Sequence, residues 1–201
     1  MTSVSFAGVI LAAGESSRMG RDKALLPWNG QTLLSANIER LKPLTQLVIV
    51  VGGKNCEALK PEIYARGAFL VVNPTPEIGQ FSSLQVGLHD VLNHGRDGAI
   101  VTLVDRPPVK PETIKLLLKA FARNFEFDNT KWAVVPDFEG KHGHPIVIGR
   151  EMMETFLRAD PKITARDVEH ANKEHIEYVP VDDPNTIINI NTPEDYAQYA
   201  G

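Results

Sequence analysis

The sequence predicts an α/β protein with a three-layer, doubly wound, mainly parallel sheet and helices on both faces. Three observations predict this fold class: six short apolar runs recur along the chain, most are apolar at every position, and amphipathic patterns separate them. Strands covered on both faces are continuously apolar, and strands that alternate with helices are typical of a parallel sheet. Ligands of such sheets bind outside the carboxyl ends of the strands.

The expected strands cover residues 6–12, 47–51, 69–72, 99–104, 132–135 and 145–148. Three helices are expected because apolar residues three and four apart share one helical face. The apolar residues of these faces are, in order, Leu34, Ile38 and Leu41 (with Pro43 ending the helix), then Leu84, Leu88, Val91 and Leu92, and then Ile114, Leu117, Leu118 and Phe121. The more polar stretches 125–131 and 159–173 are either surface loops or insertions around a substrate cleft.

Composition indicates a globular protein, and its length suits one domain over residues 1–201. Of the residues, 43% are hydrophobic and 23% charged, and the formal net charge of −4 argues against nucleic acid as the main partner. The single cysteine, Cys56, excludes an internal disulfide and lacks the neighbours of a metal or nucleophile motif. The apolar run 7–13 is too short to span a bilayer, so we expect a cytoplasmic protein without membrane contact.

The first strand leads directly into a glycine-rich, basic loop that carries the chemistry. Residues 11–26 read L-A-A-G-E-S-S-R-M-G-R-D-K-A-L-L. Glycines let the backbone turn its amides toward a ligand, Arg18 can form paired hydrogen bonds to phosphate oxygens, and Lys23 is a mobile point charge. The loop has neither the P-loop pattern nor the dinucleotide-binding pattern. A phosphate site is favoured over an ordinary surface turn because the loop follows a strand's carboxyl end.

This loop resembles the signature L-A-A-G-x-S-x-R-M-G-x-x-K-x-L-L of the MobA-like nucleotidyltransferases. That group includes the molybdenum cofactor cytidylyl- and guanylyltransferases and, more distantly, methylerythritol-phosphate cytidylyltransferase and sugar-1-phosphate nucleotidyltransferases. The similarity covers nearly the whole chain, because four further segments follow in the expected order. It implies a Rossmann-like nucleotidyltransferase fold, catalytic roles for Arg18 and Lys23, and a nucleotide site that includes Leu11, Ala12, Ala13, Gly14, Ser16, Ser17, Arg18 and Lys23.

The first two of these segments begin at Gly79 and Leu103. Gly79, Ser82 and Ser83 match a segment that faces the nucleotide base and ribose in the family; a serine capping the helix is the structural alternative. Asp105 is expected to hold Mg²⁺ against the triphosphate, since hard oxygen ligands suit that ion. The family usually has D-Q-P or D-M-P here. Arg106 replaces the middle residue, and it is assigned either to an anionic acceptor or to the solvated surface.

The third segment, His142-Gly143-His144-Pro145, matches the G-H-P of the cytidylyltransferase branch near the acceptor site. His144 is interpreted as an acceptor contact. A metal site that uses both histidines and a structural histidine at a strand edge are the alternatives.

The fourth segment runs from Asn189 to Tyr196. Thr192 and Pro193 are typical of a helix start, and the residue before them, Asn191, is by resemblance the second metal contact. Cytidylyltransferase relatives often have aspartate at that position, whereas guanylyltransferase relatives carry N-x-N-T-P. Asn191 therefore points toward the guanylyltransferase branch.

Together these residues predict a Mg²⁺-dependent nucleotidyltransferase. An acceptor phosphate would attack the α-phosphorus of the triphosphate in line, with Mg²⁺ held by Asp105 and Asn191 and with Arg18 and Lys23 offsetting charge at the departing pyrophosphate. Ala13 stands where guanylyltransferases have a second glycine, and its methyl group narrows the base pocket. The expected reaction is therefore transfer of CMP from CTP to a phosphorylated acceptor, molybdopterin, as in molybdenum cofactor biosynthesis.

Several alternatives stay open. Within the superfamily, the nucleotide could be another triphosphate such as GTP, or the acceptor a sugar or alditol phosphate. A non-catalytic nucleotide-binding partner in the maturation of a molybdoenzyme is an alternative of another class. A nucleotide-sugar glycosyltransferase is disfavoured, because such enzymes place D-x-D where this chain has Asp105-Arg106-Pro107.

Overall fold

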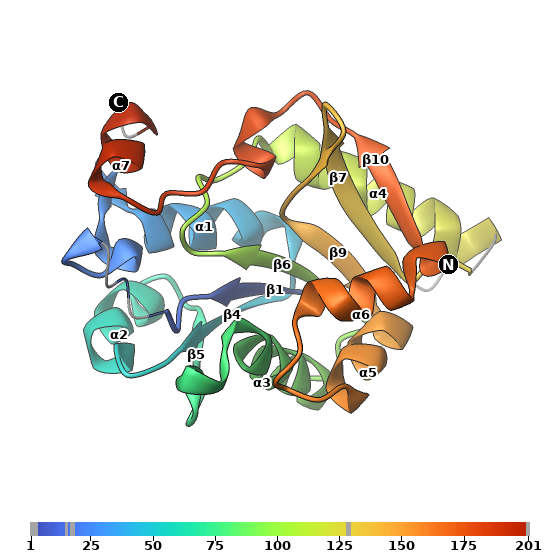
Figure 1. Ribbon diagram of the computed structural model, residues 1–201, viewed down its shortest axis with the longest axis horizontal. Coiled ribbons are helices and arrows are strands. Elements are labelled where there is room, and N and C mark those ends of the chain that lie inside the picture. The colour runs from blue at the N-terminus through green and yellow to red at the C-terminus, as the bar shows by residue number, and fades with distance from the viewer. Residues whose placement is uncertain (1–3, 15, 17–18, 128–129, 200–201) are drawn as a thin grey trace.

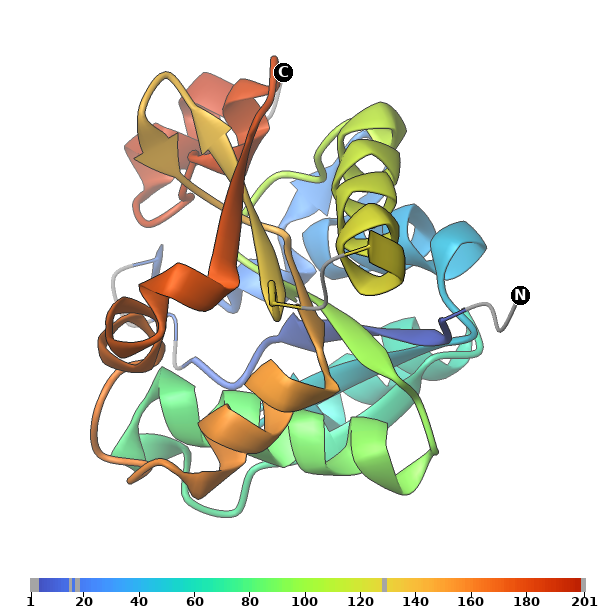
Figure 2. The ribbon, with the colours of Figure 1, turned by 90° about the vertical axis from the view of Figure 1, so that its right-hand side faces the viewer.

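A computed structural model describes residues 4–14, 16, 19–127 and 130–199. A central sheet lies between two layers of helices (Figure 1, Figure 2). In spatial order its strands are β10 (Ile176–Pro180), β7 (Ala133–Phe138), β9 (Ile146–Gly149), β6 (Gly98–Leu103), β1 (Phe6–Leu11), β4 (Leu47–Gly52) and β5 (Phe69–Val72), and β8 (Lys141–His142) pairs with β7. The six expected strands are all present.

The sheet is mainly parallel, as predicted. β1 pairs in parallel with both β4 and β6, so that Val9 lies between Ile49 and Val101. β9 is antiparallel to β6 and β7, and β10 is parallel to β7. The chain first builds outward from β1 through β4 to β5 and then places β6 on the other side of β1. Ligands of α/β sheets bind at such a switch in strand order, outside the carboxyl ends of the strands.

Helices cover both faces of the sheet. One face packs against α1 (Leu33–Leu41), α2 (Cys56–Tyr64) and α4 (Pro111–Phe127), and the other against α3 (Gln80–Asn93), α5 (Arg150–Arg158) and α6 (Ala165–Ala171). Ile10 of β1 belongs to the first core cluster and Val9 to the second. Because both faces are buried, the central strands are apolar at successive positions. The three expected helices correspond to α1, α3 and α4.

Several short elements were not predicted from the sequence. These are α2, α5, α6 and β10, together with the hairpin of β2 (Pro27–Trp28) and β3 (Gln31–Thr32) and five 3-10 turns: η2 (Lys23–Leu25), η3 (Lys42–Leu44), η4 (Pro76–Ile78), η5 (Lys173–His175) and η6 (Pro184–Thr186). α6 buries only Val168, and α2 contains Pro61. Such short, mostly exposed segments have too few core positions to show a period. The polar stretch 159–173 contains α6, and α4 extends through Phe127 into the other polar stretch.

The C-terminal segment returns across the carboxyl ends of the strands and ends in α7 (Pro193–Tyr199), beside α1 and the glycine loop (Figure 1). The backbone N–H of Ile190 donates to the carbonyl of Asp105 at 2.8 Å. Asp183, which is 1% exposed, accepts from the backbone of Lys110 and the hydroxyl of Thr113, both at 2.7 Å. These contacts bring residues far apart in the sequence to one edge of the sheet. Among the described helices, none has the length and apolar character needed to cross a membrane.

Candidate active site

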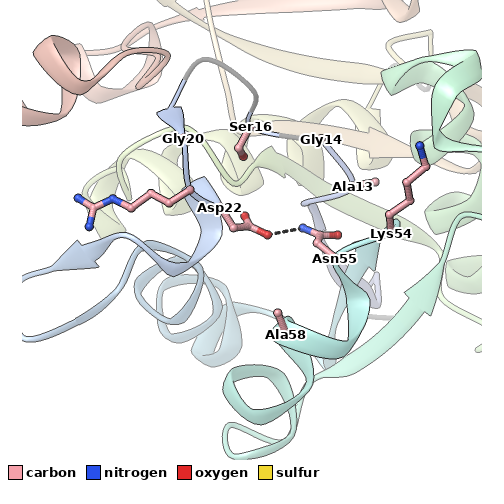
Figure 3. A pocket seen from close by; sticks show the side chains of 9 residues that line it. Ala13, Gly14, Ser16, Gly20, Asp22, Lys54, Asn55 and Ala58 are labelled. Atoms are coloured by element: carbon pink, nitrogen blue, oxygen red, sulfur yellow. Dashed lines mark hydrogen bonds between the residues drawn. The ribbon is translucent and has the colours of Figure 1, made fainter.

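The glycine loop is held by the residue just before α2. The side-chain N–H₂ of Asn55 donates to the carbonyl of Ala12 at 2.9 Å. It also donates to the carboxylate of Asp22 at 2.6 Å (Figure 3). Ala12 also donates from its backbone N–H to Val51 at 2.8 Å. Asn55 therefore joins the two ends of the loop, and this positioning residue was missed by the sequence analysis because its partners lie more than thirty positions away.

Ser16 shapes the middle of the loop. Its φ of 50° lies in the left-handed region, its carbonyl accepts from Met19 at 2.9 Å, and its hydroxyl accepts from the backbone N–H of Lys23 at 3.0 Å. The predicted residues Ser17 and Arg18 lie outside the described residues. The loop thus folds back onto its own end and directs Lys23 inward.

A cavity of about 580 Å³ lies beside the loop (Figure 3). Ala13, Gly14 and Ser16 line it from the loop, while Lys54 and Ala58 line it from the start of α2. The glycine loop and the turn between β4 and α2 approach each other closely. A Cβ added to Gly53, in that turn, would lie only 2.9 Å from the carbonyl oxygen of Ala13.

Lys23, Asp105 and Asn191 converge from three distant parts of the sequence. The ammonium group of Lys23 donates to the carboxylate of Asp105 at 3.2 Å and to the side-chain oxygen of Asn191 at 2.8 Å. Lys23 is 8% exposed, so these charges meet in a partly desolvated place where electrostatic interactions are strengthened. The structure therefore brings together three of the predicted catalytic and metal residues.

The oxygens of Asp105 and Asn191 fit a small divalent cation. The second carboxylate oxygen of Asp105 is buried and has no hydrogen-bond partner among the described residues. Mg²⁺ in phosphoryl-transfer sites takes one or two protein oxygens, and substrate phosphates and water complete its coordination. The described residues contain no cluster of three or more histidine, cysteine or acidic side chains that could hold a metal by themselves. This donor set suits a cation that binds together with phosphate.

Asn191 is positioned by the start of α7. The carboxylate of Asp195 accepts from the backbone N–H groups of Asn191 at 2.8 Å and Thr192 at 3.0 Å, and these hydrogen bonds lower the pKa of Asp195. Asp195 in turn donates from its backbone to the hydroxyl of Thr192 at 3.2 Å, which confirms the predicted helix start. Ile190, fully buried, packs with Met19 of the loop.

At the start of α3, neither Ser82 nor Ser83 caps the helix, in contrast to the structural alternative given for these serines in the sequence analysis. Gly79 precedes the helix without a side-chain cap, and the hydroxyl of Ser82 donates to the carbonyl of Gly79 at 2.7 Å. Ser82 and Ser83 are buried, and both accept from the side chain of Asn73 at 2.9 Å. A cap role for either serine is therefore wrong. Asn73, which follows β5, joins this strand to α3 and was also missed.

A second cavity, of about 880 Å³, extends from Leu11 and Gly79 to the hairpin that precedes β9 and to α6. Arg106 lines it and donates to the carbonyl of Thr186 at 2.7 Å, while its Nε is buried without a hydrogen-bond partner among the described residues. Burial lowers the pKa of Arg106, and Asp105 opposes that shift. The alternative of a solvated surface arginine is therefore wrong.

His144 lines the same cavity as a neutral imidazole. Burial is the larger cause and the positive charge of Arg106 the second; together they lower the pKa of His144 to about 3. Its Nδ1 is buried without a hydrogen-bond partner among the described residues, and its backbone N–H donates to Thr186 at 2.9 Å. A metal site built on His142 and His144 finds no third ligand in the described part of the chain. His144 can accept or donate one hydrogen bond without adding charge.

Gly143 permits this arrangement, and replacing it with alanine should destabilise the protein. A Cβ at this position would clash with the carbonyl oxygen of Thr186. Because that oxygen belongs to the backbone, the clash can be relieved only if the backbone shifts. We expect Gly143→Ala to lower the free energy of unfolding by about 1–3 kcal/mol, as overpacking does, measured by urea unfolding. Gly14→Ala is the matched control, since no atom of the described residues lies within 4 Å of the added methyl group. Equal stabilities of the two variants would contradict this packing argument.

Comparisons with known proteins show the family to which this chain belongs. A family model described as a MobA-like NTP transferase domain matches residues 8–176. The chain is 29% identical over 200 residues to the molybdenum cofactor guanylyltransferase of Shewanella putrefaciens, covering 96% of this chain and 94% of that protein. It is 27% identical over 197 residues to the molybdenum cofactor cytidylyltransferase of Escherichia coli K12, covering 94% and 92%.

Solved structures show the same fold. The protein Rv0371c of Mycobacterium tuberculosis H37Rv superposes with a TM-score of 0.80 at 24% identity, covering 97% of both chains. A nucleotidyl transferase from Methanothermobacter superposes with a TM-score of 0.79 at 21% identity, covering 98% of this chain and 96% of that one. The predicted Rossmann-like nucleotidyltransferase fold is therefore confirmed.

Proposed function

This chain belongs to the MobA-like NTP transferase family, and from that premise we propose that it transfers a nucleotidyl group from a nucleoside triphosphate to the phosphate of an acceptor. The convergence of Lys23, Asp105 and Asn191 carries this proposal. Ala13, Gly14 and Ser16 of the glycine loop line the first cavity, and Arg106, which follows Asp105 in the chain, lines the second cavity together with His144.

The reaction joins an acceptor phosphate oxygen to the α-phosphorus and breaks the bond from that phosphorus to the bridging oxygen of pyrophosphate. Lys23 would place its ammonium group against the phosphate oxygens that gain charge, and Arg106 would reduce repulsion between the two anions. Neutral His144 would hold the acceptor by a hydrogen bond. Asp105 and Asn191 would hold Mg²⁺, which supplies charge neutralisation to the triphosphate.

For the nucleotide we propose CTP, and for the acceptor molybdopterin. Ala13 supports CTP, because its methyl group lines the cavity beside the loop, where a glycine would leave more room for a purine. The curated relatives act on the molybdenum cofactor and include both cytidylyl- and guanylyltransferases. Asn191 favours GTP, which is therefore the second candidate nucleotide.

Nucleotide selectivity tests this proposal by thermal shift. With CTP at about a hundred times its dissociation constant, stability should rise by roughly 2.7 kcal/mol. The rise should require Mg²⁺ and be larger for CTP than for GTP, UTP or ATP. Ala13→Gly should move the preference toward GTP, because it removes the methyl group at the base pocket.

The outcomes separate the candidates. A Mg²⁺-dependent shift with GTP alone would contradict the proposed nucleotide but not the proposed reaction. Nucleotide binding without release of pyrophosphate from Mg²⁺, CTP and molybdopterin would favour a non-catalytic binding protein. The absence of a shift with all four nucleotides would contradict the proposed function itself.

A further inference from the structure

A carboxyl group on α6 lines the second cavity without a bonding partner. This cavity is lined by Leu11 and Gly79, which are predicted to contact the nucleotide, and by Arg106 and His144, which are predicted to contact the acceptor. Glu169 lines the cavity of about 880 Å³ and is half-buried. Among the described residues, none forms a hydrogen bond or an ion pair with its side chain. Polar groups removed from water are nearly always hydrogen-bonded, and those that are not deserve an explanation. A ligand that brings its own donors into the cavity would satisfy this carboxyl group.

The surroundings of Glu169 raise the pKa of its carboxyl group to a value near neutral pH. Burial raises the pKa of Glu169 to about 7, and the nearby Arg166 opposes this shift only in part. Burial is the larger cause that raises the pKa of Tyr178, and the negative charge of Glu169 is the second. The two side chains are therefore close enough to interact electrostatically. A carboxyl group with such a pKa ionises readily when a ligand offers hydrogen-bond donors.

A pair of stacked aromatic side chains also lines this cavity. The rings of His142 in β8 and Tyr178 in β10 stack with centroids 3.8 Å apart and planes 14° apart. Both residues line the cavity together with Glu169. In a face-to-face pair each ring covers one face of the other, so a planar ligand can pack against an outer face of the pair. Toward β6 the same cavity has an apolar lining from Val101 and Leu103.

The polar groups of this cavity differ in what they can bind. Arg106 and His144 suit a phosphate group, whereas Glu169 with the His142–Tyr178 pair suits a flat ring with N–H donors. A carboxylate has two acceptor oxygens in one plane, so it matches two neighbouring N–H groups on the edge of a heterocycle. An amino-pyrimidinone ring, as in a pterin, presents such an edge.

We propose that Glu169 determines acceptor specificity by accepting two hydrogen bonds from the amino-pyrimidinone edge of a phosphorylated pterin, while the His142–Tyr178 pair contacts the face of the ring. This inference rests on the proposed function, because it names the residue that selects the acceptor already proposed for the same site. A ring with a carbonyl in place of the amino group would place oxygen against oxygen. Sites built to hydrogen-bond an N–H strongly reject analogues that lack it.

The inference implies a specific pH dependence. Two donors require the ionised carboxylate, so ligand affinity should fall about tenfold for each pH unit below about 7 and level off above it. Other charged or titratable side chains line the same cavity: Arg166 and His170 on α6, Lys162 before it, Tyr178 on β10, Lys141 and His142 on β8, and Arg106 and His144. Replacing Glu169 by glutamine separates its contribution from theirs.

The test is a fluorescence titration with two probes. One is 6-hydroxymethylpterin phosphate, and the other is its lumazine counterpart, in which a carbonyl replaces the 2-amino group. At about pH 8, the native protein should bind the pterin at least about tenfold more tightly than the lumazine. Glu169→Gln should lose this preference and the pH dependence, and Glu169→Asp should retain part of both. Glu126→Gln, on exposed α4 surface outside the cavity, is the matched control and should behave as the native protein.

Thermal shift with Mg²⁺ and CTP on the same samples distinguishes the inference from the proposed function. A normal nucleotide shift in Glu169→Gln shows that this variant is folded. Pterin binding that is equally tight and equally selective in Glu169→Gln would overturn the inference, as would a native protein that shifts with nucleotide but shows no preference for the pterin. A native protein that selects the pterin through Glu169 but binds no nucleotide would uphold the inference and contradict the proposed function.

Discussion

Replacing Asp105 by asparagine should lower the rate of nucleotidyl transfer by about 10²–10³, as the loss of one preorganised electrostatic contact does. The carboxylate pairs with Lys23 through one oxygen, and its other oxygen is buried without a hydrogen-bond partner in the described part of the chain. Asparagine keeps the shape of the side chain and removes its charge. The measurement is the rate of pyrophosphate release with saturating Mg²⁺, nucleotide and acceptor.

Asp90→Asn is the matched control for this variant. Asp90 lies in α3, outside both cavities; its side chain is 23% exposed, like that of Asp105, and it also has a buried carboxylate oxygen without a hydrogen-bond partner among the described residues. A general effect of removing a half-buried charge would slow both variants equally. Loss of rate in Asp105→Asn alone, with an unchanged melting temperature, would locate the effect in the chemistry. Equal activity of the two variants would contradict the proposed site.

Replacing Lys23 by alanine should also lower turnover by about 10²–10³. The ammonium group is nearly buried and donates to the oxygens of Asp105 and Asn191, so it lies where the phosphate chain would meet the metal ligands. If Lys23 stabilises the charge that develops as pyrophosphate leaves, kcat should fall by more than KM rises. Steady-state kinetics with the nucleotide as the varied substrate separates these two effects.

Lys110→Ala is the control for Lys23→Ala. The Lys110 ammonium group donates to the carbonyl of Asp182 on the exposed surface, so its removal tests the loss of a lysine hydrogen bond away from the site. Urea unfolding of both variants is needed, because Lys23→Ala leaves two oxygens without their shared donor. Near-normal turnover in Lys23→Ala would eliminate the role proposed for this residue.

The strands and long helices of this fold were predictable because their periodicity depends on burial alone. β1, β4 and β6 are apolar at successive positions since both of their faces are covered. The shorter elements α2, α5, α6 and β10 were not predicted, because each buries only two or three residues or, in α6, one. Such a small number of buried positions does not distinguish a helix from a polar loop.

For the candidate site, the sequence identified the segments but not their supports. Asp105, Arg106, His144 and Asn191 were recognisable from their motifs. Asn55 and Asn73 were not, although each joins a strand end to a neighbouring loop or helix by two side-chain hydrogen bonds. A single asparagine in a polar turn has no pattern of its own, because its role depends on partners that the sequence does not place nearby.

The sequence by itself determined the α/β class, the mainly parallel sheet and the family, because local periodicity and a long contiguous motif carry that information. The phosphate role of the glycine loop stays a prediction. Only the tertiary structure decided which charges meet. It placed Lys23 between Asp105 and Asn191, buried Arg106 beside neutral His144, and brought Glu169 from a polar stretch to the lining of the second cavity. The physical reason is that burial, pKa and hydrogen-bond partners arise from contacts between residues far apart in the chain.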